Sequence, residues 1–174
     1  MNNTKTLVSL SLLVGIGAAL HLIMPGFFAS GMKPDMMLTM MFLGILLFPQ
    51  KKNVLLLGLA TGILSGLTST FPGGLVPNII DKFITAFLFY LLVMLLKKYA
   101  DSIVAVGILT AAGTIVSGTI FLTAALYIAT LPAPFMVLFT AAVLPAVLLN
   151  TVAMIIIYPI VKNIARRTNI TANA

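Results

Sequence analysis

Residues 103–130 read IVAVGILTAAGTIVSGTIFLTAALYIAT, an apolar run without a single charged side chain. A helix needs about 20 consecutive apolar residues to cross the hydrocarbon core of a bilayer, so this run is long enough to span one. The rest of the chain has the same character, because hydrophobic residues make up 61% of its 174 positions and charged residues only 7%. Soluble domains carry about 25% charged residues. The sequence therefore predicts an all-α integral membrane protein.

Short breaks that contain proline or polar residues divide the chain into apolar segments. They predict a bundle of six transmembrane helices that forms one domain over residues 1–174, with no appended soluble domain. The predicted spans are residues 7–24, 36–48, 54–69, 79–96, 103–130 and 135–161. The second span is short, so we expect it to be tilted or partly re-entrant.

Lysine and arginine residues predict the orientation of this bundle. Only Lys33 and Lys82 fall on one side of the predicted topology. The other eight fall on the side that holds both termini: Lys5, Lys51, Lys52, Lys97, Lys98, Lys162, Arg166 and Arg167. Because cytoplasmic loops are rich in lysine and arginine, we expect both termini to be cytoplasmic and the protein to lie in a cell membrane. The net charge of +7 does not indicate nucleic-acid binding, because the charges do not gather on one face.

The sequence contains no motif of a soluble catalytic or metal site. It has no G-x-x-x-x-G-K-[ST] run, no cysteine, and His21 as its one histidine. These facts exclude a P-loop ATPase, a thiolate metal site and an H-E-x-x-H metalloprotease. We therefore expect no cofactor and no metal, and an intramembrane enzyme or a structural membrane protein is the alternative of another class.

Polar residues gather in two loops on the outer side of the predicted topology. Lys33 and Asp35 precede the second span, and Asn78 and Asp81 open the fourth. Each has a structural alternative, because Asp35 and Asn78 would suit the start of a helix. Together they place a cation, two anions and an amide at the mouth of the bundle. An amino acid's carboxylate and ammonium would need such groups, and charges at the membrane edge of an apolar chain are functional candidates.

Three residues within the predicted spans are further candidates. Asn150 lies mid-span, where its amide must find a hydrogen-bond partner on another helix or on a ligand. Tyr127 suits either an aromatic belt at the membrane surface or a stacking wall around a ligand. His21 is better explained as an interfacial residue than as a proton relay.

Small residues recur every four positions in two of the predicted spans. The first stripe consists of Ser11, Gly15 and Ala19, and the second stripe consists of Gly58, Gly62 and Gly66. This spacing puts each stripe on one face of a helix, where another backbone can approach closely. Either stripe can serve packing inside the bundle or the docking of a separate membrane subunit.

Three blocks of the sequence are distinctive in wording and not merely hydrophobic. They are GMKPDMML at 31–38 with GILLFP at 44–49, FPG at 71–73 with VPNIIDK at 76–82, and LNT at 149–151 with IIYP at 156–159. These blocks resemble the bacterial tryptophan transport protein family over nearly the whole chain. That family is similar to the substrate-binding S components of energy-coupling-factor transporters, which bind vitamins through six helices.

The resemblance implies an importer with an outward-facing pocket, covered by the loops between helices one and two and between helices three and four. It implies L-tryptophan as the substrate, with Lys33 on its carboxylate and Asp35 or Asp81 on its ammonium. Asn78 or Asn150 would then meet the indole N–H. The alternative within transport is an S component for a vitamin or another aromatic solute.

The resemblance also bears on the partners of the protein. S components carry an alanine-x-x-x-alanine pattern on their first helix that packs on a transmembrane coupling subunit. Ser11, Gly15 and Ala19 match this spacing but not its alanines. An energy-coupling module, made of a transmembrane subunit and ATPases, is therefore one expected partner beside the lipid bilayer, and an ion gradient is the other source of energy.

Overall fold

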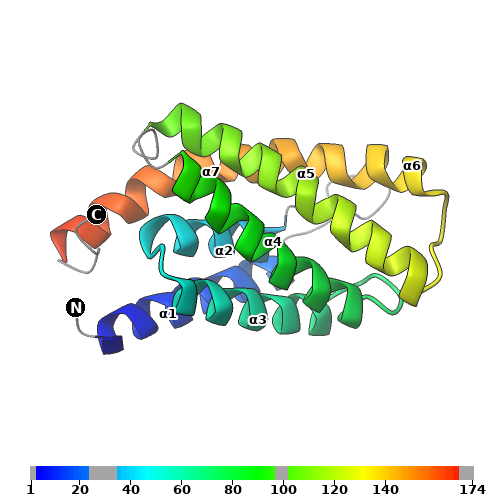
Figure 1. Cartoon of the computed structure of the whole chain (residues 1–174), viewed down its shortest axis with the longest axis horizontal. Coiled ribbons are helices and arrows are strands. Elements are labelled where there is room, and N and C mark those ends of the chain that lie inside the picture. The colour runs from blue at the N-terminus through cyan, green and yellow to red at the C-terminus, as the bar shows by residue number, and fades with distance from the viewer. Residues whose placement is uncertain (1–2, 24–34, 97–101, 169–174) are drawn as a thin grey trace.

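The computed structural model of the chain describes residues 3–23, 35–96 and 102–168. Within these ranges the chain forms helices and turns but no strand, and the helices pack side by side as a bundle (Figure 1). The helices are α1 (Asn3–Ile23), α2 (Met36–Leu47), α3 (Lys51–Leu67), α4 (Leu75–Leu95), α5 (Ile103–Ile128), α6 (Phe135–Leu138), the π-helix η2 (Phe139–Val143) and α7 (Leu144–Arg167). The last three follow one another without a break over Phe135–Arg167. The predicted all-helical architecture is confirmed.

Four of these helical segments are long and apolar enough to cross a membrane. They are Thr4–Ile23, Leu75–Leu95, Ile103–Ile128 and Phe135–Arg167. Their outer faces carry large exposed apolar side chains, such as Ile23, Leu95 and Met136. Exposed apolar surface of this extent is suited to contact with lipid. At about 1.5 Å per residue the 12 residues of α2 extend only about 18 Å, less than the hydrocarbon core of about 30 Å.

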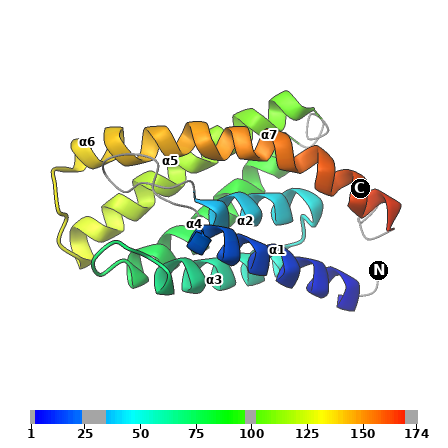
Figure 2. The same cartoon turned by 180° about the vertical axis from the view of Figure 1, so that it is seen from behind.

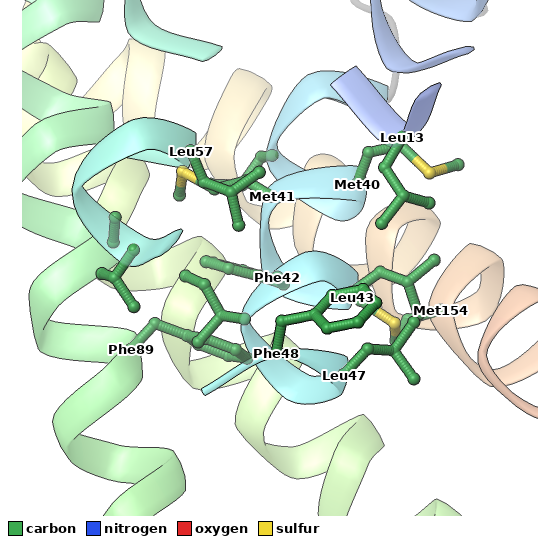
Figure 3. Close-up of a cluster of buried hydrophobic side chains, with 14 of the residues drawn as sticks. Leu13, Met40, Met41, Phe42, Leu43, Leu47, Phe48, Leu57, Phe89 and Met154 are labelled. Atoms are coloured by element: carbon green, nitrogen blue, oxygen red, sulfur yellow. The ribbon is translucent and has the colours of Figure 1, made fainter. Parts of the chain in front are cut away.

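The short helix α2 forms the centre of the bundle. All of its residues except Leu46 are buried, and helices α1, α3, α4, α5 and α7 contact it. Figure 3 shows its side chains packed against Leu13 of α1, Leu57 of α3, Phe89 of α4 and Met154 of α7. A helix that is apolar on every side must be buried, and here the neighbouring helices enclose it. The second predicted span is therefore an internal helix that the other helices shield from lipid.

An aromatic pair and a glycine fix α2 against α4 and α5. The rings of Phe42 and Phe89 stack with their centroids 3.9 Å apart. Gly113 of α5 lies against both rings, since a Cβ atom at this position would come within 2.7 Å of Phe42 Cζ. The missing side chain thus leaves the space that the stacked rings occupy.

The second stripe lies between α3 and α4. A Cβ atom at Gly62 would lie 3.0 Å from Ile79 Cα, and one at Gly66 would lie 2.8 Å from the Leu75 carbonyl oxygen. A Cβ atom at Gly58 would lie 3.1 Å from Ala86 Cβ. The stripe therefore serves internal packing, and it brings the first turns of α4 directly against α3.

The first stripe is on the outside of the bundle. Ser11, Gly15 and Ala19 are all exposed, and a Cβ atom at Gly15 would meet no atom within 4 Å in the part of the chain that the structure describes. The neighbouring Gly17 has the opposite environment, because a Cβ atom there would lie 3.1 Å from Met40 Cβ. Helix α1 thus packs on α2 through its other face and leaves this stripe uncovered.

The first and last helical residues lie at the same end of the bundle. Figure 2 shows the beginning of α1, the end of α7 and the α2–α3 connection together at this end. The α3–α4 and α5–α6 connections lie at the opposite end. This opposite end contains the polar residues described next.

Candidate functional site

A cavity of about 400 Å³ lies between the helices. Its lining includes Thr70, Phe71 and Pro72 of the α3–α4 connection and Pro132 of the α5–α6 connection. The cavity therefore lies at the end of the bundle opposite the beginning of α1. Ligand sites in proteins commonly measure about 300–1,000 Å³, so this cavity is large enough to hold a small molecule.

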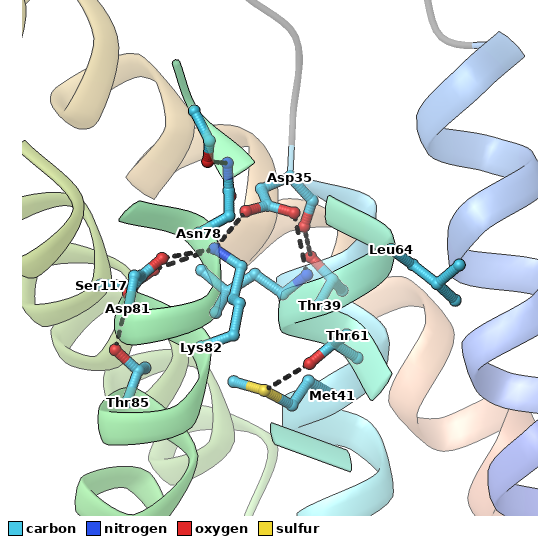
Figure 4. Close-up of polar contacts among 12 residues, drawn as sticks. Asp35, Thr39, Met41, Thr61, Leu64, Asn78, Asp81, Lys82, Thr85 and Ser117 are labelled. Carbon is cyan, nitrogen blue, oxygen red and sulfur yellow. Dashed lines mark hydrogen bonds and ion pairs between the residues drawn. The ribbon is translucent and has the colours of Figure 1, made fainter. Parts of the chain in front are cut away.

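One side of the cavity is a buried charged cluster centred on Lys82 (Figure 4). The Lys82 Nζ atom lies 2.8 Å from Asp35 Oδ2 and 2.6 Å from Asp81 Oδ2. It also donates a hydrogen bond of 3.3 Å to Ser117 Oγ. The Lys82 and Asp81 side chains are 3% and 0% exposed, whereas that of Asp35 is 25% exposed. Buried charges need partners of this kind, because their desolvation is otherwise uncompensated.

The two carboxylates of this cluster differ in their freedom to bind anything else. Asp81 accepts hydrogen bonds from Thr85 at Oδ1 (2.9 Å) and from Ser117 at Oδ2 (2.8 Å), in addition to its contact with Lys82. Asp35 caps α2, with Oδ1 accepting the Leu38 N–H at 2.9 Å, and among the described residues Lys82 is the ion-pair partner of its Oδ2. Asp35 is therefore the more accessible of the two carboxylates to a molecule in the cavity.

Helix α4 positions two of the three charges. Asp81 and Thr85 are four residues apart and so share one face of the helix, which lets the hydroxyl bond the carboxylate. The long side chain of Lys82 extends from the adjacent position to Asp35 at the beginning of α2. Lys82 was predicted only as a charge on the outer side and not as a site residue. Its place inside an apolar helix was the signal that could have identified it.

The two asparagines of the cavity have different environments. Helix α4 begins at Leu75 with Gly74 as its N-cap, so the structural alternative for Asn78, the start of this helix, is wrong. Asn78 lies inside the first turns, and its amide nitrogen donates to the Gly74 carbonyl at 2.7 Å. Asn150 is 0% exposed, and neither its Oδ1 nor its Nδ2 has a hydrogen-bond partner among the described residues.

Asn150 and Ser65 thus line the cavity with polar groups that have no hydrogen-bond partner in the described part of the chain. The Ser65 hydroxyl is also buried without a partner in the described ranges, and both residues line the cavity. A buried polar group without a hydrogen bond costs about 1–3 kcal/mol. A ligand or water in the cavity would relieve this cost.

The remaining wall of the cavity is apolar. Phe71 and Phe121 pack edge to face, with their ring centroids 5.3 Å apart, and both line the cavity. Ala142 and Val143 of η2 lie on the same wall. Single π-helical turns occur frequently at functional sites. Gly118 of α5 permits this turn to approach, since a Cβ atom there would lie 2.5 Å from Val143 Cγ1.

The other predicted site residues lie in several places. His21 lines the cavity. Tyr127 is 83% exposed and does not line it, so the interpretation of Tyr127 as a stacking wall around a ligand in this cavity is wrong. An aromatic belt at the membrane surface remains the interpretation of Tyr127 that fits this position. Lys33 lies outside the residues that the structure describes.

A known protein family matches nearly the whole chain, including the residues of the cavity. Residues 3–166 match the family model described as "Tryptophan transporter TrpP". The chain belongs to this family. It is 57% identical over 166 residues to a "Probable tryptophan transport protein" of Bacillus subtilis (strain 168), an alignment that covers 95% of each chain.

Two clostridial relatives of this transporter carry the same description. The protein of Clostridium perfringens is 38% identical and that of Clostridium acetobutylicum is 40% identical. The alignments cover 97% of both chains in the first case, and 94% of this chain and 95% of the relative in the second. No solved structure matches the chain. The transporter is a multi-pass bacterial membrane protein, and Asp35, Asp81, Lys82 and Asn150 all lie within the matched region.

Proposed function

We propose that this transporter imports L-tryptophan and binds it in the cavity between α2, α4, α5 and α7. The observation that carries the proposal is the divided lining of the cavity. Charged groups of both signs lie on one side, and elsewhere in the lining lie two phenylalanines and an amide that has no partner within the described ranges. Free tryptophan needs this combination, because it joins an ammonium and a carboxylate to an apolar ring with one N–H donor. The relatives named as probable tryptophan transport proteins support this choice of substrate.

Asn150 is the residue that we assign to the indole N–H. Its Oδ1 is a buried acceptor without a partner among the described residues, whereas the Asn78 amide already donates to Gly74. Phe71 and Phe121 would pack against the ring, because aromatic pairs favour edge-to-face or offset arrangements. A site of this kind discriminates against ligands that lack the N–H donor, since they would leave the Asn150 acceptor unpaired.

We also propose that the end of the bundle with the beginning of α1 is cytoplasmic and that the cavity opens to the outside. Lys51 and Lys52 at the start of α3 and Arg166 and Arg167 at the end of α7 are exposed at this end, which supports that orientation. The resulting arrangement is six helical segments with both termini inside, as in an S component. It would place Asp35 and Lys82 where an external solute arrives first.

The exposed first stripe bears on how transport is energised. The first stripe is exposed and uncovered by the described residues, so Ser11, Gly15 and Ala19 are available to a second membrane protein. A transmembrane coupling subunit with its ATPases is the partner that we propose for this surface. At the substrate site, Lys33 remains a predicted contact. The alternative is transport by the chain itself on an ion gradient.

The absence of tryptophan from the chain provides a direct test of the substrate. The protein contains four tyrosines and no tryptophan, so excitation at the red edge of the indole band should leave the ligand-free protein nearly dark. Added L-tryptophan should give a saturable emission that is shifted to the blue, because a ligand site buries most of its ligand's surface. A reconstituted protein that binds a vitamin but gives no saturable blue-shifted signal would assign the cavity to the vitamin instead.

The indole contact has its own test and a matched control. We expect 1-methyl-L-tryptophan, which lacks the N–H donor, to bind more weakly than L-tryptophan by about 1–3 kcal/mol. Asn150→Leu should reduce this difference, and Thr151→Val should preserve it. Thr151 also carries a buried hydroxyl without a partner in the described ranges but does not line the cavity. If the parent protein bound both ligands equally, Asn150 would have no role in recognising the indole.

A further inference from the structure

The donors of Lys82 are fully used inside the protein. A lysine ammonium has three N–H donors, and three oxygens surround this one. They belong to Asp35 (2.8 Å), Asp81 (2.6 Å) and Ser117 (3.3 Å). A carboxylate that enters the cavity can therefore bind Lys82 fully only if one of these oxygens leaves.

Asp81 and Ser117 are held in place by bonds to each other and to their neighbours. Ser117 donates to Asp81 Oδ2 at 2.8 Å, Thr85 donates to Asp81 Oδ1 at 2.9 Å, and the Asp81 side chain is 0% exposed. Displacing Asp81 would break two hydrogen bonds between neutral donors and a buried carboxylate, and it would leave that carboxylate unpaired.

Asp35 is the partner that can be exchanged. Its side chain is 25% exposed, and the contact of its Oδ2 with Lys82 is the one that joins the start of α2 to α4 within this cluster. Its Oδ1 accepts the Leu38 N–H and can keep doing so while Oδ2 changes partner. Asp35 and Lys82 both line the cavity.

We propose that the amino-acid head of the substrate inserts between Asp35 and Lys82. The substrate carboxylate replaces Asp35 Oδ2 at Lys82 Nζ, and the substrate ammonium binds the released Asp35 carboxylate. The exchange converts one internal ion pair into two ion pairs with the ligand, so no buried charge loses its counter-charge. Lys82 thus determines specificity for the carboxylate and Asp35 for the ammonium. This inference rests on the proposed function.

The exchange requires both charges on the same ligand. Tryptamine supplies the ammonium without the carboxylate, and 3-indolepropionate supplies the carboxylate without the ammonium. Either ligand leaves one protein charge without its new partner if it opens the Asp35–Lys82 pair. Truncating one member of a buried charge pair costs enough to lower affinity by about 30-fold or more. We expect both ligands to bind at least that much more weakly than L-tryptophan.

The test combines these ligands with substitutions in the full-length protein, reconstituted in lipid nanodiscs. Each ligand carries an indole, so its own blue-shifted emission reports its binding. Asp35→Asn keeps a residue suited to an N-cap and should weaken L-tryptophan by about 30-fold or more. The same substitution should not weaken 3-indolepropionate, because its carboxylate then no longer displaces a charged partner from Lys82. Lys82→Met should weaken L-tryptophan and 3-indolepropionate but should not weaken tryptamine, because its ammonium then meets an Asp35 carboxylate that has lost its internal partner.

Two further variants separate this proposal from a general loss of structure. Lys51→Met makes the same change at an exposed lysine of the opposite end and should alter no affinity. Asp81→Asn should weaken L-tryptophan and 3-indolepropionate by a similar factor and should not weaken tryptamine, because Asp81 holds Lys82 and does not touch the ligand. If Lys82→Met shows no thermal unfolding transition, the ligand series on the parent protein and on Asp35→Asn decides the matter.

The outcomes distinguish the two levels of the proposal. If the parent protein shows no saturable binding of L-tryptophan, the proposed function fails. If the parent binds L-tryptophan, and tryptamine and 3-indolepropionate bind as tightly, the insertion between Asp35 and Lys82 is overturned. An equal loss of affinity for all three ligands in Asp35→Asn would also overturn it.

Discussion

The two stripes of small residues have the same spacing and opposite surroundings. Gly62 and Gly66 on α3 lie against the backbone of α4, whereas a Cβ atom at Gly15 on α1 would meet no atom of the described residues within 4 Å. A spacing of four residues shows only that small residues share a helix face. What that face meets is decided by the rest of the bundle. The second stripe therefore positions α4, which carries residues of the site. The first stripe is available for contact with lipid or with a second membrane protein.

The second stripe acts on the site through α4. Its glycines let α3 and the first turns of α4 approach, and those turns carry Asn78, Asp81 and Lys82. Widening this contact would move Lys82 away from Asp35, which is fixed at the start of α2 by its hydrogen bond to Leu38. Packing at the stripe and charge pairing in the cavity are thus linked.

Gly66→Ala should give the largest loss of stability in this comparison. The new Cβ atom would lie 2.7 Å from Leu75 Cδ1, 2.8 Å from the Leu75 carbonyl oxygen and 3.0 Å from Leu75 Cα. Backbone atoms cannot move aside as a flexible side-chain end can, and overpacking of this kind costs about 1–3 kcal/mol. We expect a lower unfolding temperature in detergent and weaker ligand binding. Unchanged values of both would show that α4 can shift without disturbing the site.

Gly15→Ala should increase the stability of the protein, whereas Gly66→Ala should decrease it. Replacing a helical glycine by alanine, where the new methyl group meets nothing, stabilises a protein by about 0.4–1 kcal/mol, because the unfolded chain loses conformational freedom. The side chain would contact no atom within 4 Å in the described part of the chain. The same unfolding measurement should therefore show a small rise in stability. A loss comparable to that of Gly66→Ala would mean that the first stripe is packed within the protein.

Much of this architecture could be predicted from hydropathy, and part of the cavity from topology. Apolar runs of sufficient length fold as helices in a membrane, because every backbone polar group must be satisfied internally. Helices α2 and α4 begin toward the same end of the bundle, which explains why Asp35, Asn78 and Asp81 line one cavity. These predictions need only the number of helices and their direction.

The remaining site residues depend on helix rotation and on contacts between distant segments. Phe121 and Tyr127 are six positions apart on α5 and so point to different faces at about 100° per residue, yet both suit an aromatic wall by sequence. Only packing shows that Phe121 faces the cavity and Tyr127 the outside. The pairing of Asp35 with Lys82 is likewise a contact between α2 and α4, which no local pattern contains.

Gly15→Leu should have the smallest effect on ligand binding, and it tests what the first stripe does. A leucine on this exposed face would contact no described residue through its Cβ atom, so the free energy of unfolding should not fall, as in Gly15→Ala. L-tryptophan binding should stay at the level of the parent protein, because the stripe is not part of the cavity. Uptake of labelled tryptophan by cells that produce the variant should fall sharply if a coupling subunit docks there, because bulk would block close approach of its backbone. Leu12→Phe is the matched control, since Leu12 is 63% exposed on the same helix and already carries a large side chain. Normal uptake by Gly15→Leu would instead assign the first stripe to lipid and favour transport on an ion gradient.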